Sequence, residues 1–191
     1  MSNTNTESSN VTPPHFNWKH PTCFDNASLL GQWAIENLGG QGPGTSLMDL
    51  GSGKCALINA CSRLPSFHFL KAVDEEHYGS FCDSGCEFIN QEIESYLTSL
   101  GEQKEDVIFC ENVLNEILDE DKLSRILSLI FYNMTEDGSF LCSVFVTSGH
   151  ISKRWAQADF ESLLEQHGFA IERTYLADDG LLSVHLRKST T

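Results

Sequence analysis

The chain has 191 residues, a length that suits one globular domain with a sizeable core. Its 27 acidic residues against 12 basic ones leave a formal charge of −15, and no basic patch stands out for a nucleic-acid backbone or an anionic membrane. No apolar run approaches the roughly 20 residues that span a bilayer, and the polar residues 1–12 lack the apolar core of a secretory signal. These features predict a cytoplasmic protein without nucleic-acid or membrane partners.

The N-terminal part of the chain divides at a pair of prolines. Residues 1–14 are rich in Ser, Thr and Asn, which is typical of a disordered leader. An aromatic stretch follows, containing Phe16, Trp18, His20 and Phe24. Asp25 is placed to cap a helix over residues 25–38, which Gly39-Gly40 would end. We expect residues 15–40 to form a lid and helix within one domain spanning residues 15–191.

Strand-like and helix-like segments alternate after this point. The expected strands cover residues 46–50, 67–73, 86–93, 106–110 and 139–146. The expected helices cover residues 55–64, 75–82, 95–100 and 121–133. Such alternation predicts a parallel sheet with right-handed crossovers. The end of the chain differs: a helix over residues 158–167 precedes two strands, 169–176 and 181–187, whose Asp-Gly turn predicts an antiparallel hairpin.

The most informative segment is the glycine turn after the first strand. Asp49 lies near the carboxyl end of this strand. Gly51 and Gly53, which lack a Cβ, let the backbone approach a ligand closely before the next helix begins. The second strand ends in Asp74, at about the 20-residue distance usual for an acid that hydrogen-bonds a ribose. Together these positions predict a site for a nucleoside-containing cofactor.

In their order and spacing, these segments resemble the class I S-adenosylmethionine-dependent methyltransferases over about residues 25–188. The matching motifs are Leu47-Met48-Asp49 with the glycine turn, Val73-Asp74, residues 88–93, residues 106–114, residues 136–141 and His167-Gly168-Phe169. The resemblance implies a doubly wound α/β fold. Its mostly parallel seven-stranded sheet would carry a C-terminal antiparallel hairpin and helices on both faces. The sequence departs from the family at Lys54, a long residue inside the loop, and at Cys55, where a third glycine is common.

The resemblance also implies S-adenosylmethionine as cofactor, S-adenosylhomocysteine as product and a small-molecule acceptor, with a peptide or protein acceptor left open. The implied cofactor contacts are Asp49, Gly51, Ser52 and Gly53 in the glycine turn, Asp74 and Glu75 at the ribose, Glu92 and Ile93 at the adenine, and Glu111 and Asn112 at the methionine part. Two alternatives remain for the acids. Asp49 could cap local N–H groups, and Glu75 fits a helix N-terminal acid better than a ribose ligand.

No catalytic residue is assigned, because the methyl group of a sulfonium is already activated and the protein mainly has to align the acceptor. The candidates are Glu116, Asn115 and His150. Glu116 could act as a base if burial raised its pKa, or it could be a solvated or capping acid. His150 could accept a proton or be a surface residue. Phe16, Trp18 and Trp155 could line an acceptor pocket or pack elsewhere.

Two other classes of function stay open. The spacing Gly51-x-Gly53-x-x-Ala56 also fits a nicotinamide-dependent oxidoreductase, although the expected terminal hairpin argues against it. A non-catalytic methyltransferase-like binding module would keep the fold without the activity. A metal site is not expected: Cys82 and Cys86 have a ligand-like spacing, but no second pair or nearby His-x-x-x-His completes a set.

Overall fold

The computed structural model describes residues 44–146, 155–178 and 180–189. The expected leader, the expected lid and helix over residues 15–40, and His150 lie outside these ranges.

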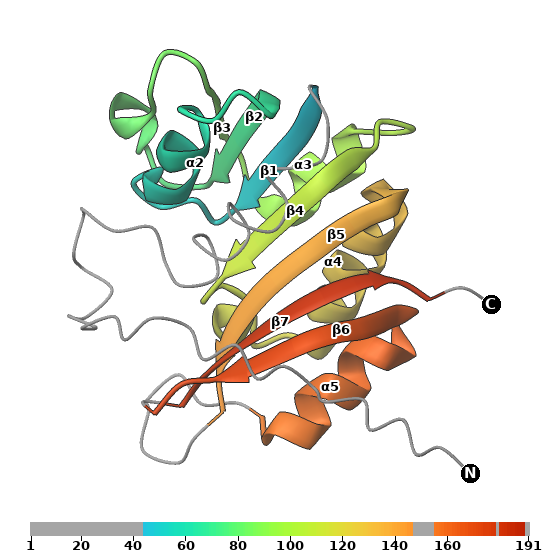
Figure 1. The fold of residues 1–191 in the computed structure, drawn as a ribbon. Coiled ribbons are helices and arrows are strands. Elements are labelled where there is room, and N and C mark those ends of the chain that lie inside the picture. Colours follow the sequence, from blue (N-terminus) through green and yellow to red (C-terminus); the bar gives the residue numbers. More distant parts are fainter. Residues whose placement is uncertain (1–43, 147–154, 179, 190–191) are drawn as a thin grey trace, which may run out of the picture.

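A seven-stranded sheet with the order β3-β2-β1-β4-β5-β7-β6 forms the centre of the described chain (Figure 1). The strands are β1 Thr45–Leu50, β2 Phe67–Asp74, β3 Glu87–Asn90, β4 Glu105–Glu111, β5 Met134–Phe145, β6 Phe169–Leu176 and β7 Leu181–Lys188. The first five pair in parallel, whereas β7 runs antiparallel to both β5 and β6. The predicted mostly parallel sheet with a reversed C-terminal hairpin is therefore confirmed.

Helices cover the two faces of the sheet, as Figure 1 shows. The α-helices are α2 Ala56–Cys61, α3 Ile93–Ser99, α4 Glu120–Asn133 and α5 Gln157–Gln166. One apolar cluster joins α3, α4 and α5 to one face, and a second joins α2 to the opposite face of β1, β2 and β4. The doubly wound arrangement follows, because each parallel crossover must bury its apolar side against the sheet.

The sequence pattern of α4 explains why this helix forms where it does. The side chain of Asp119 accepts a hydrogen bond from the Lys122 N–H at 3.0 Å and caps the first turn. Leu123, Ile126, Leu127 and Ile130 recur at helical spacing and are buried against the sheet. The helix has 14 residues, and no helix within the described ranges has the length and apolar character needed to cross a bilayer.

The connection between β2 and β3 differs from the prediction. The expected helix over residues 75–82 is wrong, since only a short 3-10 turn, η1 Gly79–Phe81, forms there. The Asn90 amide donates to the carbonyl oxygens of Asp74, Glu75 and Glu76 at 3.1, 2.8 and 3.1 Å. These carbonyls would have to accept helical N–H groups to start a helix, so their use by Asn90 favours an extended turn.

The third strand is also shorter than the expected residues 86–93. Glu92 lies outside β3 and caps α3, because its carboxylate accepts a hydrogen bond from the Ser95 N–H at 2.9 Å. Ile93 is then the first residue of the helix. The prediction that this strand extends to residue 93 is therefore wrong. The strand ends at Asn90 because Glu92 caps the helix that follows.

The fifth strand begins earlier than residue 139. Glu105 pairs with Met134 and Val107 with Ser139, so residues 135–138 bulge out opposite Asp106 alone. A Cβ on Gly138 would lie 2.9 Å from Thr135 Oγ1 and 3.0 Å from the Thr135 carbonyl oxygen. Asp137-Gly138 thus lies in a bulge inside β5, where glycine lets the chain fold tightly on itself.

Candidate cofactor-binding site

The candidate site lies where the strand order reverses. From β1 the chain proceeds to β2 and β3 on one side, and then returns to β4 and β5 on the other. In open α/β sheets, ligands bind outside the carboxyl ends of the strands at this switch point. The segments that leave β1, β2 and β4 there contain most of the cofactor contacts that the sequence predicts.

The glycine loop, residues 51–55, lies over the end of β2. The N–H groups of Gly51 and Ser52 both donate to the Val73 carbonyl oxygen, at 2.8 and 3.1 Å. The Gly53 N–H donates to Asp74 Oδ2 at 2.8 Å. These bonds join the predicted loop to the predicted ribose-binding acid, 21 residues further along the chain.

Gly51 and Gly53 have different structural roles, although both have positive φ angles of 71° and 51°. A Cβ on Gly51 would lie 2.3 Å from Val113 Cγ2, so packing against the segment after β4 requires glycine there. A Cβ on Gly53 would meet nothing within 4 Å. The open side of Gly53 leaves room for a ligand to approach the backbone.

Cys55 shows how the chain accommodates its departure from the family pattern. This residue is the N-cap of α2 and has a left-handed backbone, with φ of 61° and ψ of 23°. Glycine adopts this conformation without strain, whereas it costs other residues about 1–2 kcal/mol. The Cys55 side chain is fully buried in the cluster beneath α2, which offsets part of that strain. Lys54 instead points outward, with its Nζ 5.3 Å from the centre of the Phe81 ring.

Asp49 is a buried carboxyl group in an acidic environment. Its side chain is 4% exposed. Burial, reinforced by the nearby carboxylates of Glu111 and Asp74, raises the pKa of Asp49 well above its usual range. A bound cation would relieve this repulsion and favour the ionised form.

Asp74 is half-buried and presents both carboxylate oxygens to backbone N–H groups. Besides Gly53, the Glu76 N–H donates to it, at 2.9 Å to Oδ1. A carboxylate has about four lone-pair positions, so capacity for two hydroxyl donors remains. Glu75 is exposed. Asn90, which holds the turn after Asp74, was not among the predicted site residues; its position opposite Asp74 in the β2–β3 register is the signal that identifies it.

Glu92 is already engaged by protein groups. Its Oε1 lies 2.9 Å from Lys122 Nζ, and its Oε2 caps α3. Burial alone would raise the pKa of Glu92, but the Lys122 hydrogen bond and the N–H groups of Ser95 and Glu94 lower it to about 2. The carboxylate therefore remains ionised, and its predicted contact with adenine stays a prediction.

The segment after β4 folds back toward β5. Asn112 has a positive φ of 57°, and its N–H donates to the Ser143 carbonyl oxygen at 3.0 Å. Asn115 is buried in the short turn η2 Leu114–Glu116, and its amide donates to the Phe145 carbonyl oxygen at 3.4 Å. Asn115 therefore anchors this turn to β5.

The remaining acceptor candidates receive less support. Glu116 is exposed in the η2 turn, as expected for a solvated acid. Trp155 packs against Phe160 of α5, with ring centres 5.2 Å apart, as the packing alternative predicts. Phe16, Trp18 and His150 lie outside the described residues.

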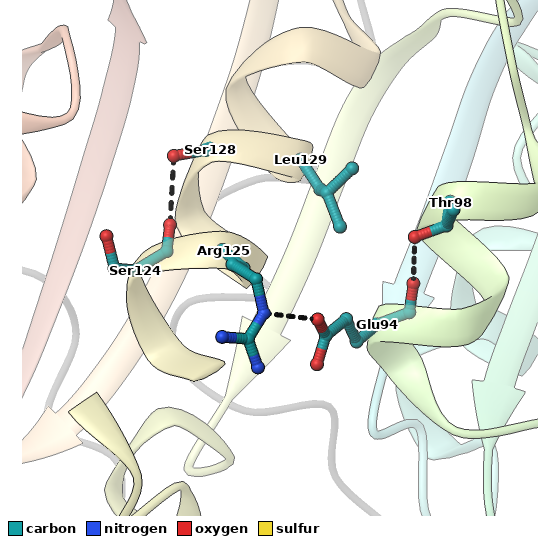
Figure 2. Close-up of a pocket in the computed structure, with 6 residues that line it drawn as sticks. All are labelled: Glu94, Thr98, Ser124, Arg125, Ser128 and Leu129. Atoms are coloured by element: carbon teal, nitrogen blue, oxygen red, sulfur yellow. Dashed lines mark hydrogen bonds and ion pairs between the residues drawn. The ribbon is translucent and has the colours of Figure 1, made fainter. Parts of the chain in front are cut away.

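A shallow groove between α3 and α4 is separate from this site (Figure 2). Arg125 Nε pairs with Glu94 Oε1 at 2.6 Å across the groove. The hydroxyls of Thr98 and Ser128 donate to carbonyl oxygens of their own helices, at 2.7 and 2.9 Å. Four of the six lining side chains, those of Glu94, Thr98, Arg125 and Ser128, thus already have polar partners within the protein. Nor do the described residues contain a group of three or more His, Cys, Asp or Glu side chains arranged to hold a metal ion.

Solved structures with the same architecture identify the fold. A TehB-like S-adenosylmethionine-dependent methyltransferase from Corynebacterium glutamicum has a TM-score of 0.67 at 18% identity, covering 86% of this chain and 90% of that one. The 1,6-didemethyltoxoflavin-N1-methyltransferase of Burkholderia thailandensis, solved with its acceptor and S-adenosylhomocysteine, has a TM-score of 0.67 at 19% identity, covering 84% and 77%.

The magnesium protoporphyrin IX methyltransferase of Synechocystis, with bound S-adenosylmethionine, has a TM-score of 0.63 at 19% identity, covering 84% and 76%. No protein-family model and no curated protein sequence matches the chain. The likeness is therefore one of structure: the chain has the fold of the class I S-adenosylmethionine-dependent methyltransferases.

Proposed function

We propose that this protein is a methyltransferase that uses S-adenosylmethionine to methylate a small-molecule acceptor. The observation that carries the proposal is the glycine loop at the switch point, with the open side of Gly53 next to Asp74. The residues present fit the cofactor. The glycine loop offers backbone that no side chain covers, and Asp74 offers a carboxylate for the ribose hydroxyls. The buried Asp49 offers a carboxyl group that a positive charge would favour in its ionised form.

When bound, S-adenosylmethionine supplies a methyl group already activated on a sulfonium. Asp74 accepts hydrogen bonds from the ribose hydroxyls while continuing to hold the Gly53 N–H. Asp49 balances the cofactor's positive charge, and Glu111 adds to the same negative field. Glu92 and Ile93 border the adenine. The protein's main contribution is orientation and exclusion of water, which explains why no catalytic triad is needed.

The acceptor we propose is neutral or cationic, because the net charge of −15 disfavours a polyanion. Structural neighbours include enzymes named for small-molecule acceptors, among them the mitomycin 7-O-methyltransferase and the toxoflavin enzyme. We further propose that residues 15–40 close over the cofactor as a lid in a single domain, and that the protein works in the cytoplasm. Hydrogen exchange tests the lid: amides around Trp18 should gain protection with S-adenosylhomocysteine, and unchanged exchange there would refute it.

A pair of glycine variants tests the cofactor assignment. Gly53 and Gly101 both have positive φ, 51° and 61°, and a Cβ at either position would meet no atom within 4 Å. Valine at either position should cost similar stability, about 1–2 kcal/mol from backbone strain. Gly101 lies in the turn after α3, so Gly101→Val should keep S-adenosylhomocysteine binding, and Gly53→Val should abolish it.

Thermal shift and calorimetry read out this comparison. At a ligand concentration of 100 Kd, S-adenosylhomocysteine should stabilise the wild-type chain and Gly101→Val by about 2.7 kcal/mol. Stabilisation by NADH alone would support an oxidoreductase instead. The absence of a shift with either ligand would refute the proposed function and favour a binding module.

A further inference from the structure

Three cysteine thiols gather where the glycine loop meets the connection between β2 and β3. Cys55 ends the loop, Cys82 follows η1, and Cys86 precedes β3. All three are free thiols; Cys55 is buried and the other two are half-buried against the same apolar cluster. The Cys82 thiol lies close enough to the thiols of Cys55 and Cys86 to raise the pKa of each.

Polar contacts from α2 hold Cys82 in this position. The Asn59 amide donates to the Phe81 carbonyl oxygen at 2.7 Å, and Asn59 Oδ1 accepts from the Asp83 N–H at 2.9 Å. One side chain thus binds the backbone on both sides of Cys82. The Cys86 thiol donates to the Ile58 carbonyl oxygen at 3.8 Å, which fastens the end of the same segment to α2.

We propose that Cys82 and Cys55 are a redox pair, which a glutathione-type disulfide oxidises to a bond that weakens cofactor binding at the glycine loop. The regulatory half of this inference rests on the proposed function. The disulfide itself rests on the placement of the thiols.

The exchange balances in two steps. The half-buried Cys82 thiol loses a proton and attacks one sulfur of glutathione disulfide, forming a mixed disulfide and releasing one glutathione. The Cys55 thiol then loses its proton and attacks the Cys82 sulfur, releasing the second glutathione. Two protein thiols are oxidised and one small disulfide is reduced. Burial and the Cys82 neighbour raise the pKa of Cys55, so the second step should accelerate as the pH rises.

The bond would act on the glycine loop because of where Cys55 lies. A disulfide needs a Cβ–Cβ separation of about 3.8 Å, so its formation draws Cys55 toward the β2–β3 connection. Cys55 has a left-handed backbone two residues after Gly53, whose N–H is bonded to Asp74. A bond between Cys82 and Cys86 would instead span a single turn, in which the Cys86 N–H donates to the Asp83 carbonyl oxygen at 3.0 Å. Such a bond would not involve a residue of the glycine loop.

Disulfide mapping of the full chain tests the pairing. The protein is incubated in mixtures of reduced and oxidised glutathione, free thiols are blocked by alkylation, and non-reduced peptides are identified by mass spectrometry. We expect a linked Cys55–Cys82 peptide in the wild type and in the matched variant Cys86→Ser, and none in Cys82→Ser. A Cys82–Cys86 link, a glutathione adduct alone, or seven alkylated thiols would overturn the pairing.

Calorimetry with S-adenosylhomocysteine tests the consequence. The oxidised wild type should bind at least about fivefold more weakly than the reduced protein, with recovery in dithiothreitol and no change for Cys82→Ser. A mapped Cys55–Cys82 bond with unchanged affinity would overturn the regulatory role. Failure of the reduced protein to bind would refute the proposed function, while the mapping would still decide the redox pair.

Discussion

Asp74 connects the glycine loop to the predicted ribose position, so Asp74→Ala perturbs both structure and binding. The variant removes the acceptor for the Gly53 and Glu76 N–H groups, at 2.8 and 2.9 Å. Hydrogen bonds to a charged acceptor contribute about 1.5–3 kcal/mol when well shielded. Asp74 is half-buried, so water can replace part of these hydrogen bonds in the variant. We therefore expect the loss of both bonds to lower the free energy of unfolding by about 1–2 kcal/mol.

Binding should suffer separately from stability. Loss of the charged acceptor for two ribose hydroxyls corresponds to about 1.5–3 kcal/mol, or roughly 10- to 100-fold weaker S-adenosylhomocysteine binding. The separate stability loss of about 1–2 kcal/mol should lower the melting temperature of the unliganded protein by about 2–8 °C for a chain of this size. Asp74→Asn should also bind weakly, because an amide offers one acceptor oxygen where the carboxylate offers two.

Isothermal titration calorimetry with S-adenosylhomocysteine measures the effect, and circular dichroism confirms the fold. Glu76→Ala removes the same charge from an exposed side chain nearby and should change affinity less than about twofold, about 0.4 kcal/mol at most. Glu75→Ala decides whether the neighbouring acid shares the role. Unchanged affinity in folded Asp74→Ala would refute the ribose assignment, and equal weakening by Glu76→Ala would show a general charge effect instead.

Three further predictions concern the loop and the buried charges. Gly51→Ala places a Cβ 2.3 Å from Val113 Cγ2 and should lower the free energy of unfolding, measured with denaturant, by about 1–3 kcal/mol. Adding Val113→Ala should restore part of this stability, and a double variant without any recovery would contradict the packing explanation. Since the folded pKa of Asp49 is raised, the folded state holds the extra proton, so apo stability should fall as pH rises from about 4 through that pKa. Asp49→Asn should flatten this decline in thermal melts and weaken S-adenosylhomocysteine binding; an unaltered pH profile would contradict the assignment. Glu105→Ala leaves Lys71 without its partner at 2.6 Å and should lower stability by about 2–4 kcal/mol, since Glu105 is 2% and Lys71 19% exposed; a loss below about 0.5 kcal/mol would show that water replaces the pair.

Local signals in the sequence determined the strand alternation, the glycine loop, the acid that ends β2 and the reversed hairpin. Each depends on residues close in the chain: apolar runs between turns, two glycines, and an Asp-Gly pair between strand-like segments. Backbone sterics and burial act on such patterns wherever they occur, and S-adenosylmethionine binding was inferred from their order.

Only the tertiary structure decided features that depend on contacts across the sheet. Asn90 reaches back to the carbonyl oxygens after Asp74 and prevents the expected helix there, because β3 lies beside β2. Lys71 and Glu105 form an ion pair although they are 34 residues apart in the sequence. No local pattern around either residue predicts this pairing. The raised pKa of Asp49 likewise depends on its burial in the folded sheet and on Glu111 of β4 beside it. Charge interactions and side-chain hydrogen bonds act over a few ångströms in space, so the folded chain alone determines which groups meet.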